Sequence, residues 1–427
     1  MVLVLLLLLA AALLVLGFEM FLVMGVPAIA SRYVYQPGLP DIVIAQKMMG
    51  GVNVSTLLAI PFFIFAADLM ARGTIAKRLM DLIQRNLGHR AGGIGHTTVV
   101  SCMSFGAVCG SAPATVAALG RLLKPELVRA GYSERFSLGL IASSAECALL
   151  IPPSITLLVY GWLTGTSIAA LFAGGLSVGI VLGLAFLAMV HIETRRSGAR
   201  PDPRASAAER VAALKAGLLA LGMPVIILGG IYGGKFTATE AAAVSVAYAL
   251  LVEIGVYRSL GWRDVVDTAQ ASAVTTVTIF VLLAMGSLVA YFITLAQVPN
   301  LLIAFFQDNQ IGWISFLLLV NLLLLVAGMF IDPNSILLVL VPTLYPVAVS
   351  LGIDPVHFGL IVCLNICIGM ITPPFGLDLF VTSTTLDRPV ETVVAGIWPF
   401  IAANLLVLAV VSYVPSVSLL LPRLLAN

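Results

Sequence analysis

Residues 94–120 read IGHTTVVSCMSFGAVCGSAPATVAALG, an apolar stretch broken by glycine, proline and hydroxyl side chains. Basic residues flank it on both sides: Arg72, Lys77, Arg78, Arg85 and Arg90 before it, and Arg121, Lys124, Arg129 and Arg135 after it. In membrane proteins, short loops rich in Lys and Arg stay on the cytoplasmic side. The stretch is therefore predicted to enter a membrane from the cytoplasm and to return to it as a re-entrant hairpin.

The composition supports a membrane setting. Of the 427 residues, 60% are hydrophobic and 10% are charged, and the mean hydropathy is +1.11. A soluble domain carries about 25% charged residues, so lipid is the predicted solvent. The net charge is +2 and there is no basic arm, which argues against nucleic acid as a partner. The five cysteines form no CxxC pair, and we expect them to be small buried side chains without a disulfide.

A helix needs about 20 apolar residues to cross a bilayer. Stretches of this kind occur at 2–29, 53–71, 136–165, 167–192, 213–233, 238–257, 268–296, 355–383 and 393–424. The first has no basic segment before it, so we interpret it as a single membrane span rather than as a cleaved signal peptide. The stretch 312–350 is interrupted by Gly, Pro and polar residues, as 94–120 is.

Further charges indicate the orientation of the second half. Two more basic clusters, at 195–215 and 258–263, are predicted to face the cytoplasm, whereas the linker 297–311 has no Lys or Arg and is predicted to be periplasmic. The stretch 312–350 would then enter from outside and return there. The two interrupted stretches are thus predicted to be oppositely oriented re-entrant hairpins.

The sequence also repeats at a fixed offset of 221 residues. The matching pairs are Leu123/Leu344, Pro125/Pro346, Val128/Val349, Gly131/Gly352, Pro152/Pro373 and Pro153/Pro374. Four of these matches are Pro or Gly, the residues that interrupt helices. An inverted repeat built around broken helices is typical of secondary transporters.

Polar groups near the breaks are candidate ligands, each with a structural alternative. The Ser and Gly residues of the first hairpin either bind a hard cation or only permit close helix packing. In the second hairpin, Asp332 either binds an ion or caps the helix that follows. The pairs Pro152-Pro153, before Ser154, and Pro373-Pro374 break a helix and expose carbonyl groups, or only kink it.

Two isolated acids, Glu146 and Asp378, lie close to the Pro pairs. A charge in lipid is costly, so both are predicted to face the protein interior or a water-filled path. Each either lines the path of the substrate or ion, or is held in place by hydrogen bonds. The sequence has no HExxH, GxSxG or P-loop motif, so an intramembrane enzyme using these two acids is only a remote alternative. Without an ATP site, transport would draw on an ion gradient.

Short motifs along nearly the whole chain resemble one family, the large membrane subunit of tripartite ATP-independent periplasmic (TRAP) transporters, of the DctM type. The matching stretches are GVPA (25–28), LLAIPFFIFA (57–66), GSAPATVAALG (110–120), IPPSI (151–155), FTATEAAAV (236–244), GMFIDP (328–333), GIDPVHFG (352–359) and ITPPFG (371–376). Two positions depart from the family pattern: the segment 145–150, which contains Glu146, and Asp378.

The resemblance implies an elevator-type carrier in which sodium binds near the hairpin tips and helix breaks. Carried over by position, the sodium ligands would be Ser104, Gly110, Ser111, Thr115, Gly328, Asp332, Asn334, Thr372 and Gly376. The substrate path would include Glu146, Pro152, Pro153, Ser154, Pro373, Pro374 and Asp378. Sodium is the only metal implied, and no other cofactor is expected.

The sequence therefore predicts an all-α polytopic membrane protein with three parts: a first half at 1–193, a cytoplasmic linker and central helix pair at 194–267, and an inverted second half at 268–427. It would be the large subunit of a sodium-coupled importer of a small organic anion, a carboxylate, in the bacterial inner membrane. The resemblance implies a separate small membrane subunit and a periplasmic binding protein as partners. The alternative is a stand-alone symporter of the divalent-anion/sodium kind.

Overall fold

The computed structural model describes residues 2–425, without the side chains of residues 2–4 and 7, and this part of the chain is helical throughout, with no strand. The helices up to the middle of the chain are α1 (Val2–Val15), α2 (Met20–Tyr35), α3 (Asp41–Val52), the short 3-10 helix η1 (Ser55–Leu58), α4 (Ala59–Arg72), α5 (Ile75–Leu87), α6 (Gly93–Cys109), α7 (Ala112–Ala130), α8 (Glu134–Leu150), α9 (Ile155–Thr164) and α10 (Ile168–Ser197).

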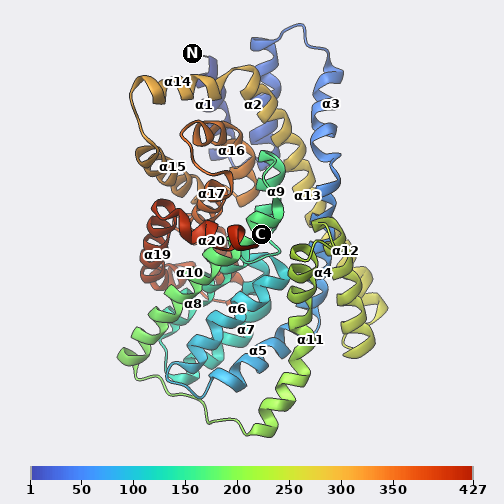
Figure 1. Cartoon of the computed structure of the whole chain (residues 1–427), viewed down its shortest axis with the longest axis vertical. Helices are drawn as coiled ribbons and strands as arrows, with labels where there is room; N and C mark the ends of the chain where they lie inside the picture. The colour runs from blue at the N-terminus through green and yellow to red at the C-terminus, as the bar shows by residue number, and fades with distance from the viewer. Residues whose placement is uncertain (1, 426–427) are drawn as a thin grey trace.

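The second part continues in the same way (Figure 1). Its helices are α11 (Ala207–Tyr232), α12 (Ala238–Leu250), the π-helix η2 (Leu251–Val256), α13 (Trp262–Leu295), α14 (Val298–Asp308), α15 (Trp313–Gly328), α16 (Pro333–Ser350), α17 (Pro355–Met370), α18 (Leu377–Leu386), α19 (Val390–Tyr413) and α20 (Pro415–Leu425). Eight helical segments in the described residues are long and apolar enough to cross a membrane, when η1 is joined to α4, α8 to α9, and α12 to η2. The prediction of an all-α polytopic membrane protein is confirmed.

The helix bounds repeat at the offset seen in the sequence. Helices α7 and α16 begin at residues 112 and 333, and α8 and α17 begin at 134 and 355, an offset of 221 in each case. Helices α9 and α18 run over 155–164 and 377–386, an offset of 222. Gly131 and Gly352, which follow α7 and α16, both have positive φ angles, of 106° and 76°, which glycine adopts at little cost. In Figure 1, α6 and α7 lie in the lower half of the molecule and α15 and α16 in the upper half.

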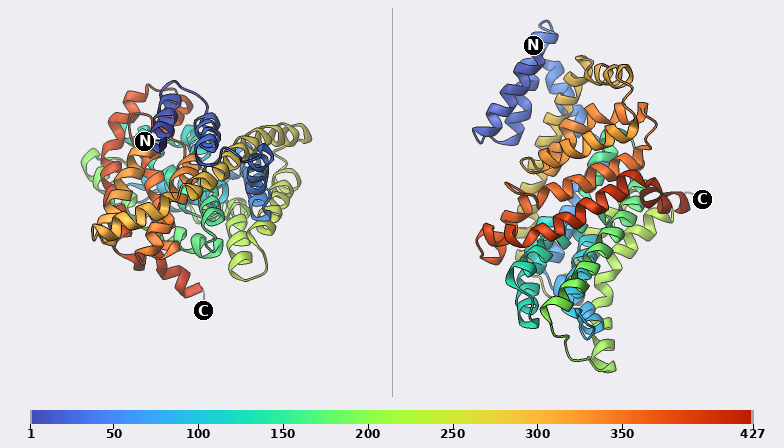
Figure 2. Two further views of the ribbon diagram at one scale, coloured as in Figure 1. Left: turned by 90° about the horizontal axis from the view of Figure 1, so that it is seen from above. Right: turned by 90° about the vertical axis from the view of Figure 1, so that its left-hand side faces the viewer.

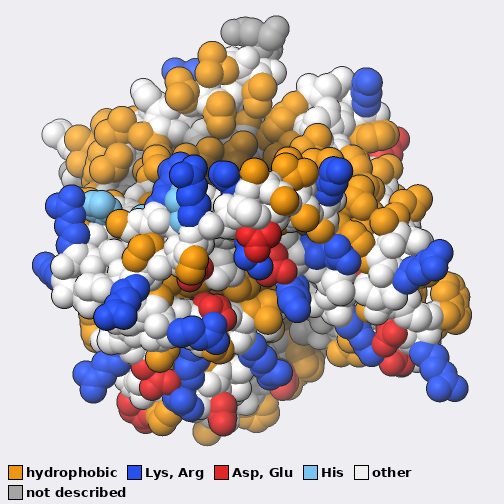
Figure 3. All heavy atoms as spheres, turned by 90° about the horizontal axis from the view of Figure 1, so that it is seen from below, with side chains coloured by type: hydrophobic (Ala, Val, Ile, Leu, Met, Phe, Trp, Pro, Cys, Tyr) orange, Lys and Arg blue, Asp and Glu red, His pale blue; other side chains and the backbone are white. Residues whose placement is uncertain are grey.

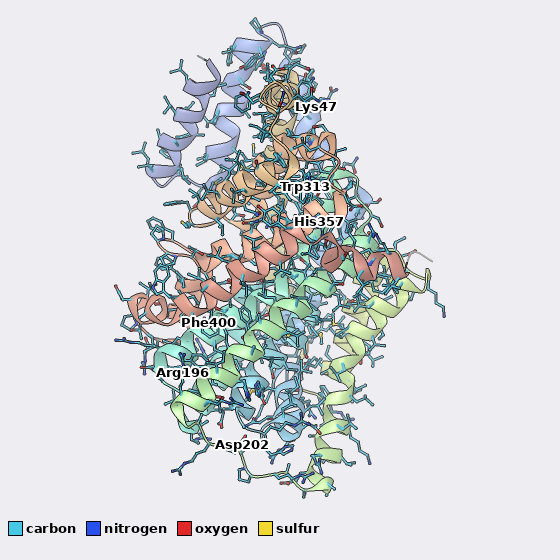
Figure 4. All side chains as sticks on the ribbon, turned by 60° about the vertical axis from the view of Figure 1, so that its left-hand side comes forward. Lys47, Arg196, Asp202, Trp313, His357 and Phe400 are labelled. Atoms are coloured by element: carbon cyan, nitrogen blue, oxygen red, sulfur yellow. The ribbon has the colours of Figure 1, made fainter. Side chains whose placement is uncertain are left out.

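The basic residues gather at the lower end. Seen from below, the molecule presents many Lys and Arg side chains, with Asp and Glu among them (Figure 3). Arg196, in the last turn of the long helix α10, and Asp202, in the loop before α11, lie towards this end in Figure 4, and Lys47 lies near the other end. Asp202 holds the loop in place, because it accepts a hydrogen bond from Gln84 Nε2 at 3.0 Å.

The core lies where the two repeats meet. Helix α8 is buried along nearly its whole length and packs against α6, α7 and α19. Helix α17 is equally buried and packs against α15, α10 and α19. Helices α2, α3 and α4 pack on the long helix α13, and α12 packs on α4. The N-terminal helices, in blue, stand at one end of the molecule, and the C-terminus lies near mid-height (Figure 2).

Two sequence expectations about single helices are wrong. The stretch 2–29 is not one span, because α1 ends at Val15 and α2 begins at Met20, and the two helices pack against each other. Gly17, with a φ of 76°, allows the chain to turn between them. The stretch 393–424 is also divided, into α19 and α20, at Val414, which precedes Pro415. A residue before proline is disfavoured in helical geometry.

Candidate functional site

Four helices begin around one central cavity. The cavity has a volume of 760 Å³, and its lining includes residues from the first turns of α7, α9, α16 and α18. We call these four helix N-termini the tip wall; its members in the lining are Ser111, Pro113, Ala114, Ile155, Thr156, Pro333, Asn334 and Leu377, with Asp332 at the start of α16. A helix N-terminus carries roughly half a positive charge and unpaired N–H groups, so the tip wall favours negative charge in the cavity.

Each of the first three N-termini is formed by a capping residue that the sequence supplies. Ser111 Oγ accepts from the N–H of Ala114 at 3.4 Å, and Asp332 Oδ1 accepts from the N–H groups of Asn334 and Ser335 at 3.1 Å each. Pro113 and Pro333 lie in first turns, where no amide donor is needed. Asp332 is therefore a helix cap, as one of the two sequence interpretations has it, and it also lines the cavity.

The first Pro pair separates α8 from α9, and Ser154 bridges the break. Its hydroxyl donates to the carbonyl of Leu149 at 2.5 Å and accepts from the N–H of Leu157 at 3.3 Å. One side chain thus satisfies a freed carbonyl before the break and a freed amide after it. At the second break, Thr372 Oγ1 donates to the carbonyl of Ile368 at 2.6 Å. The Pro152–Pro153 and Pro373–Pro374 peptide bonds are both cis.

Each hairpin end packs directly on a break. A side chain at Gly110 would place its Cβ 2.1 Å from the carbonyl oxygen of Pro153. A side chain at Gly328 would place its Cβ 2.7 Å from the Cα of Gly369, just before the second break. Both positions therefore require glycine for close approach. The carbonyl groups of hairpin and break are brought together in this way, as a cation site made of backbone oxygens would need.

The structure brings only some of the predicted ligands together. Gly110, Ser111, Asp332 and Asn334 line the same cavity. The other candidates, Ser104, Thr115, Gly328, Thr372 and Gly376, are not part of its lining. Thr115 Oγ1 donates to the carbonyl of Ser111 at 2.9 Å, so its hydroxyl supports the hairpin turn.

Glu146 and Asp378 are fully buried and lie outside the cavity lining. Asn404 Nδ2 donates to Glu146 Oε2 at 3.3 Å. Within residues 2–425, the other Glu146 oxygen and both Asp378 oxygens have no hydrogen-bond partner. Asp378 lies in the first turn of α18, where an acid is favoured by the helix dipole. Pro152, Pro153 and Ser154 are buried, whereas Pro374 is exposed.

The rest of the cavity lining contains a residue that the sequence analysis missed. Helices α2, α4 and α13 form this part, which we call the outer wall. Asp68, on α4, lines the cavity and accepts a hydrogen bond from Ser272 Oγ of α13 at 2.6 Å. Thr275 and Thr278 of α13 line the same wall. The sequence does contain a signal for Asp68, because it is an isolated acid within the apolar stretch 53–71. The same signal singled out Glu146.

Membrane-crossing helices around a cavity, with paired hairpin ends and broken helices at its centre, define a polytopic transport protein. The sequence matches the family model of the DctM component of the tripartite ATP-independent periplasmic transporters over residues 7–417. The chain belongs to this family. It is a transporter subunit, so the enzyme alternative is excluded.

The chain is similar to several curated large permeases. One is the ectoine/5-hydroxyectoine TRAP transporter large permease protein UehC of Ruegeria pomeroyi, 42% identical over 376 residues and covering 88% of each chain. Another is the C4-dicarboxylate TRAP transporter large permease protein DctM of Pseudomonas aeruginosa, 39% identical over 386 residues and covering 90% of each chain. The fold is similar to the crystal structure of the Alcanivorax borkumensis YdaH transporter, with a TM-score of 0.60 and 14% identity over 92% of this chain and 88% of that chain.

Proposed function

We propose that this chain is the large permease subunit of a sodium-coupled TRAP transporter that imports a small organic anion, a carboxylate, across the bacterial inner membrane. The negative charge of the proposed substrate is inferred from the helix N-termini that meet at one cavity, among which those of α7 and α9 have no acid of their own. Helix N-termini bind carboxylates without any basic side chain. Ectoine and C4-dicarboxylates, for which the two relatives are named, share a carboxylate group.

Sodium is the proposed coupling ion. The hairpin ends and breaks supply hydroxyl, amide and carboxylate oxygens together with backbone carbonyls, which are hard ligands. Asn334 Oδ1 and Ser335 Oγ, beside Asp332, are buried atoms without a hydrogen-bond partner in residues 2–425. Unpaired buried oxygens of this kind are costly unless an ion or water binds them. In the proposed elevator cycle, the tip wall moves with the substrate against the outer wall.

The proposed partners are a separate small membrane subunit and a periplasmic binding protein. The family is tripartite, and its DctM model accounts for residues 7–417 of this chain. The proposed parts of the chain are those predicted from the sequence, at 1–193, 194–267 and 268–427, with the loop between α10 and α11 on the cytoplasmic side.

The test is uptake by the complex of all three proteins in proteoliposomes. The binding protein is first screened by thermal shift against ectoine, succinate, malate and 4-aminobutyrate. Uptake of the ligand that binds is then measured under an inward sodium gradient. We expect uptake that requires both the sodium gradient and the binding protein. Uptake by this chain alone would contradict the proposal and favour a stand-alone symporter.

A further inference from the structure

The charges that line the cavity are unusual for the binding site of an anion. The lining includes three acids, Glu19, Asp68 and Asp332, and none of the described residues in it is Lys, Arg or His. Glu19 is exposed, and the Asp332 carboxylate is engaged by the N-terminus of α16. Asp68 is therefore the acid of the cavity that is neither at the open surface nor used to cap a helix.

Asp68 has one carboxylate oxygen available. Oδ2 accepts from Ser272 Oγ, and Oδ1 has no hydrogen-bond partner among residues 2–425. The nearest basic residue along α4 is Arg72, one turn away, but its guanidinium binds Asp264 and Asp267 of α13 at 3.1 and 3.4 Å. Among residues 2–425, no Lys, Arg or His side chain forms an ion pair with Asp68. A half-buried carboxylate without a counter-charge is costly, and a cation in the cavity would remove that cost.

The two walls of the cavity thus favour opposite charges. The tip wall presents four helix N-termini: those of α16 and α18 already have the acids Asp332 and Asp378, whereas those of α7 and α9 have none and attract a carboxylate. The outer wall presents the Asp68 carboxylate, fixed in position by Ser272. The neighbouring hydroxyls of Thr275 and Thr278 donate to carbonyls of their own helix, at 3.3 and 3.0 Å, and so do not compensate the Asp68 charge.

We propose that Asp68 binds a cationic group of the substrate, so that the cavity selects a zwitterion over a dianion. The carboxylate of the substrate faces the tip wall, and its ammonium or amidinium group faces Asp68. A dianion of the same size would place its second carboxylate against Asp68, where like charges repel. This inference rests on the proposed function, because it assumes that the cavity is the substrate site, and it narrows the proposed carboxylate substrate from an anion to a zwitterion without net charge.

The variant Asp68→Asn tests the proposal, since it keeps the shape and the hydrogen bond from Ser272 but removes the charge. The probes are 4-aminobutyrate and succinate, two four-carbon chains of which one ends in an ammonium and the other in a second carboxylate, together with ectoine. In the wild-type complex we expect uptake of a zwitterionic probe and little uptake of succinate. Asp68→Asn should raise the KM for the zwitterion at least tenfold and leave the sodium concentration for half-maximal uptake unchanged.

The matched control is Asp81→Asn, the same change at an exposed position of α5 outside the cavity lining, which should leave the KM unchanged. If the Asp68→Asn complex does not assemble, competition in the wild-type complex still tests the proposal. 4-Aminobutyrate or ectoine should inhibit uptake of the ligand that the binding protein binds, and succinate should not. Preferential uptake of succinate, or a shift in sodium dependence without a change in KM, would overturn the inference. No sodium-driven uptake of any probe would instead contradict the proposed function.

Discussion

Asp332 combines two roles that one pair of variants can separate. It caps α16 and lines the cavity, whereas Asp354 caps α17 with the same geometry and lies outside that cavity. Asp354 Oδ1 accepts from the N–H groups of Val356 and His357 at 2.8 and 3.1 Å. Each acid is followed by a proline at the first position of its helix. The two residues therefore differ in location and not in local structure.

Replacing each of these acids with Ala should cost similar stability but have different effects on transport. Loss of an N-cap costs about 0.5–2 kcal/mol, so both Asp332→Ala and Asp354→Ala should lower the melting temperature of the purified complex by similar amounts. Sodium-dependent uptake should be abolished by Asp332→Ala and retained by Asp354→Ala. Equal uptake by the two variants would mean that Asp332 is a cap and nothing more.

Glu146 is expected to act through its hydrogen bond with Asn404. It lies outside the cavity lining, and Asn404 is the one side chain of residues 2–425 that donates to it. Glu146→Gln preserves an acceptor and should transport like the wild type between pH 6 and 8. Glu146→Leu leaves the Asn404 amide unpaired and should cost about 1–3 kcal/mol of stability, measured by thermal denaturation. A changed pH or sodium dependence in Glu146→Gln would instead assign Glu146 to the transport path.

The ends of helices were predictable from the sequence where the residues that interrupt the helix lie at the break itself. A Pro pair removes two amide donors, so the ends of α8 and α17 follow from residues 152–153 and 373–374 alone. The break between α1 and α2 was missed because residues 16–18 are apolar apart from one glycine. Asp68 could be seen in the sequence as an isolated acid in an apolar stretch, but its place in the cavity depends on a contact with α13, about 200 residues away in the chain. Such a contact leaves no trace in a single sequence.

A buried group of hydrogen bonds around Glu253, which we call the joint, connects η2, the continuation of α12, to α5. The Glu253 carboxylate, in η2, is fully buried and accepts from the N–H groups of Thr74 and Ile75 at 3.1 and 3.0 Å and from the Ser259 hydroxyl. It thereby caps the N-terminus of α5 from a distant part of the chain. Gly73 leaves room for it, because a Cβ there would lie 2.2 Å from the carboxyl group. Helix α5 in turn packs on α6 of the first hairpin.

The joint should contribute more stability than an exposed cap. Glu253→Ala leaves the buried Ile75 amide and the half-buried Thr74 amide without a partner and should cost about 2–4 kcal/mol. Glu240→Ala removes the exposed capping box of α12, in which Glu240 accepts from the N–H of Thr237 at 2.8 Å, and should cost at most about 1 kcal/mol. Melting temperatures of the purified variants give the comparison. A smaller loss for Glu253→Ala than for Glu240→Ala would show that the joint is not a stabilising contact.

At the scale of the whole molecule, the distribution of Lys and Arg predicts the orientation of the protein in the membrane. The loop before α11 and the helix α14 lie at opposite ends of the molecule in Figure 1, and Pro203 and Asn309 in these two regions are both exposed. The five native cysteines are all buried, so they provide an unlabelled background. In intact cells, an impermeant thiol reagent added to the periplasmic side should label Asn309→Cys and not Pro203→Cys. The reverse pattern would contradict the positive-inside assignment and the inverted orientation of the two halves.

The division of the cavity into two walls also bears on how new transporters arise. The positive potential of the tip wall comes from backbone amides, which every sequence with these helix starts retains. A point mutation cannot easily abolish it without destroying the breaks themselves. The outer wall, by contrast, acts through side chains such as Asp68, Thr275 and Thr278, each open to exchange by a single codon change. Paralogues would therefore keep the same binding of the carboxylate and differ in substrate specificity through changes in α2, α4 and α13.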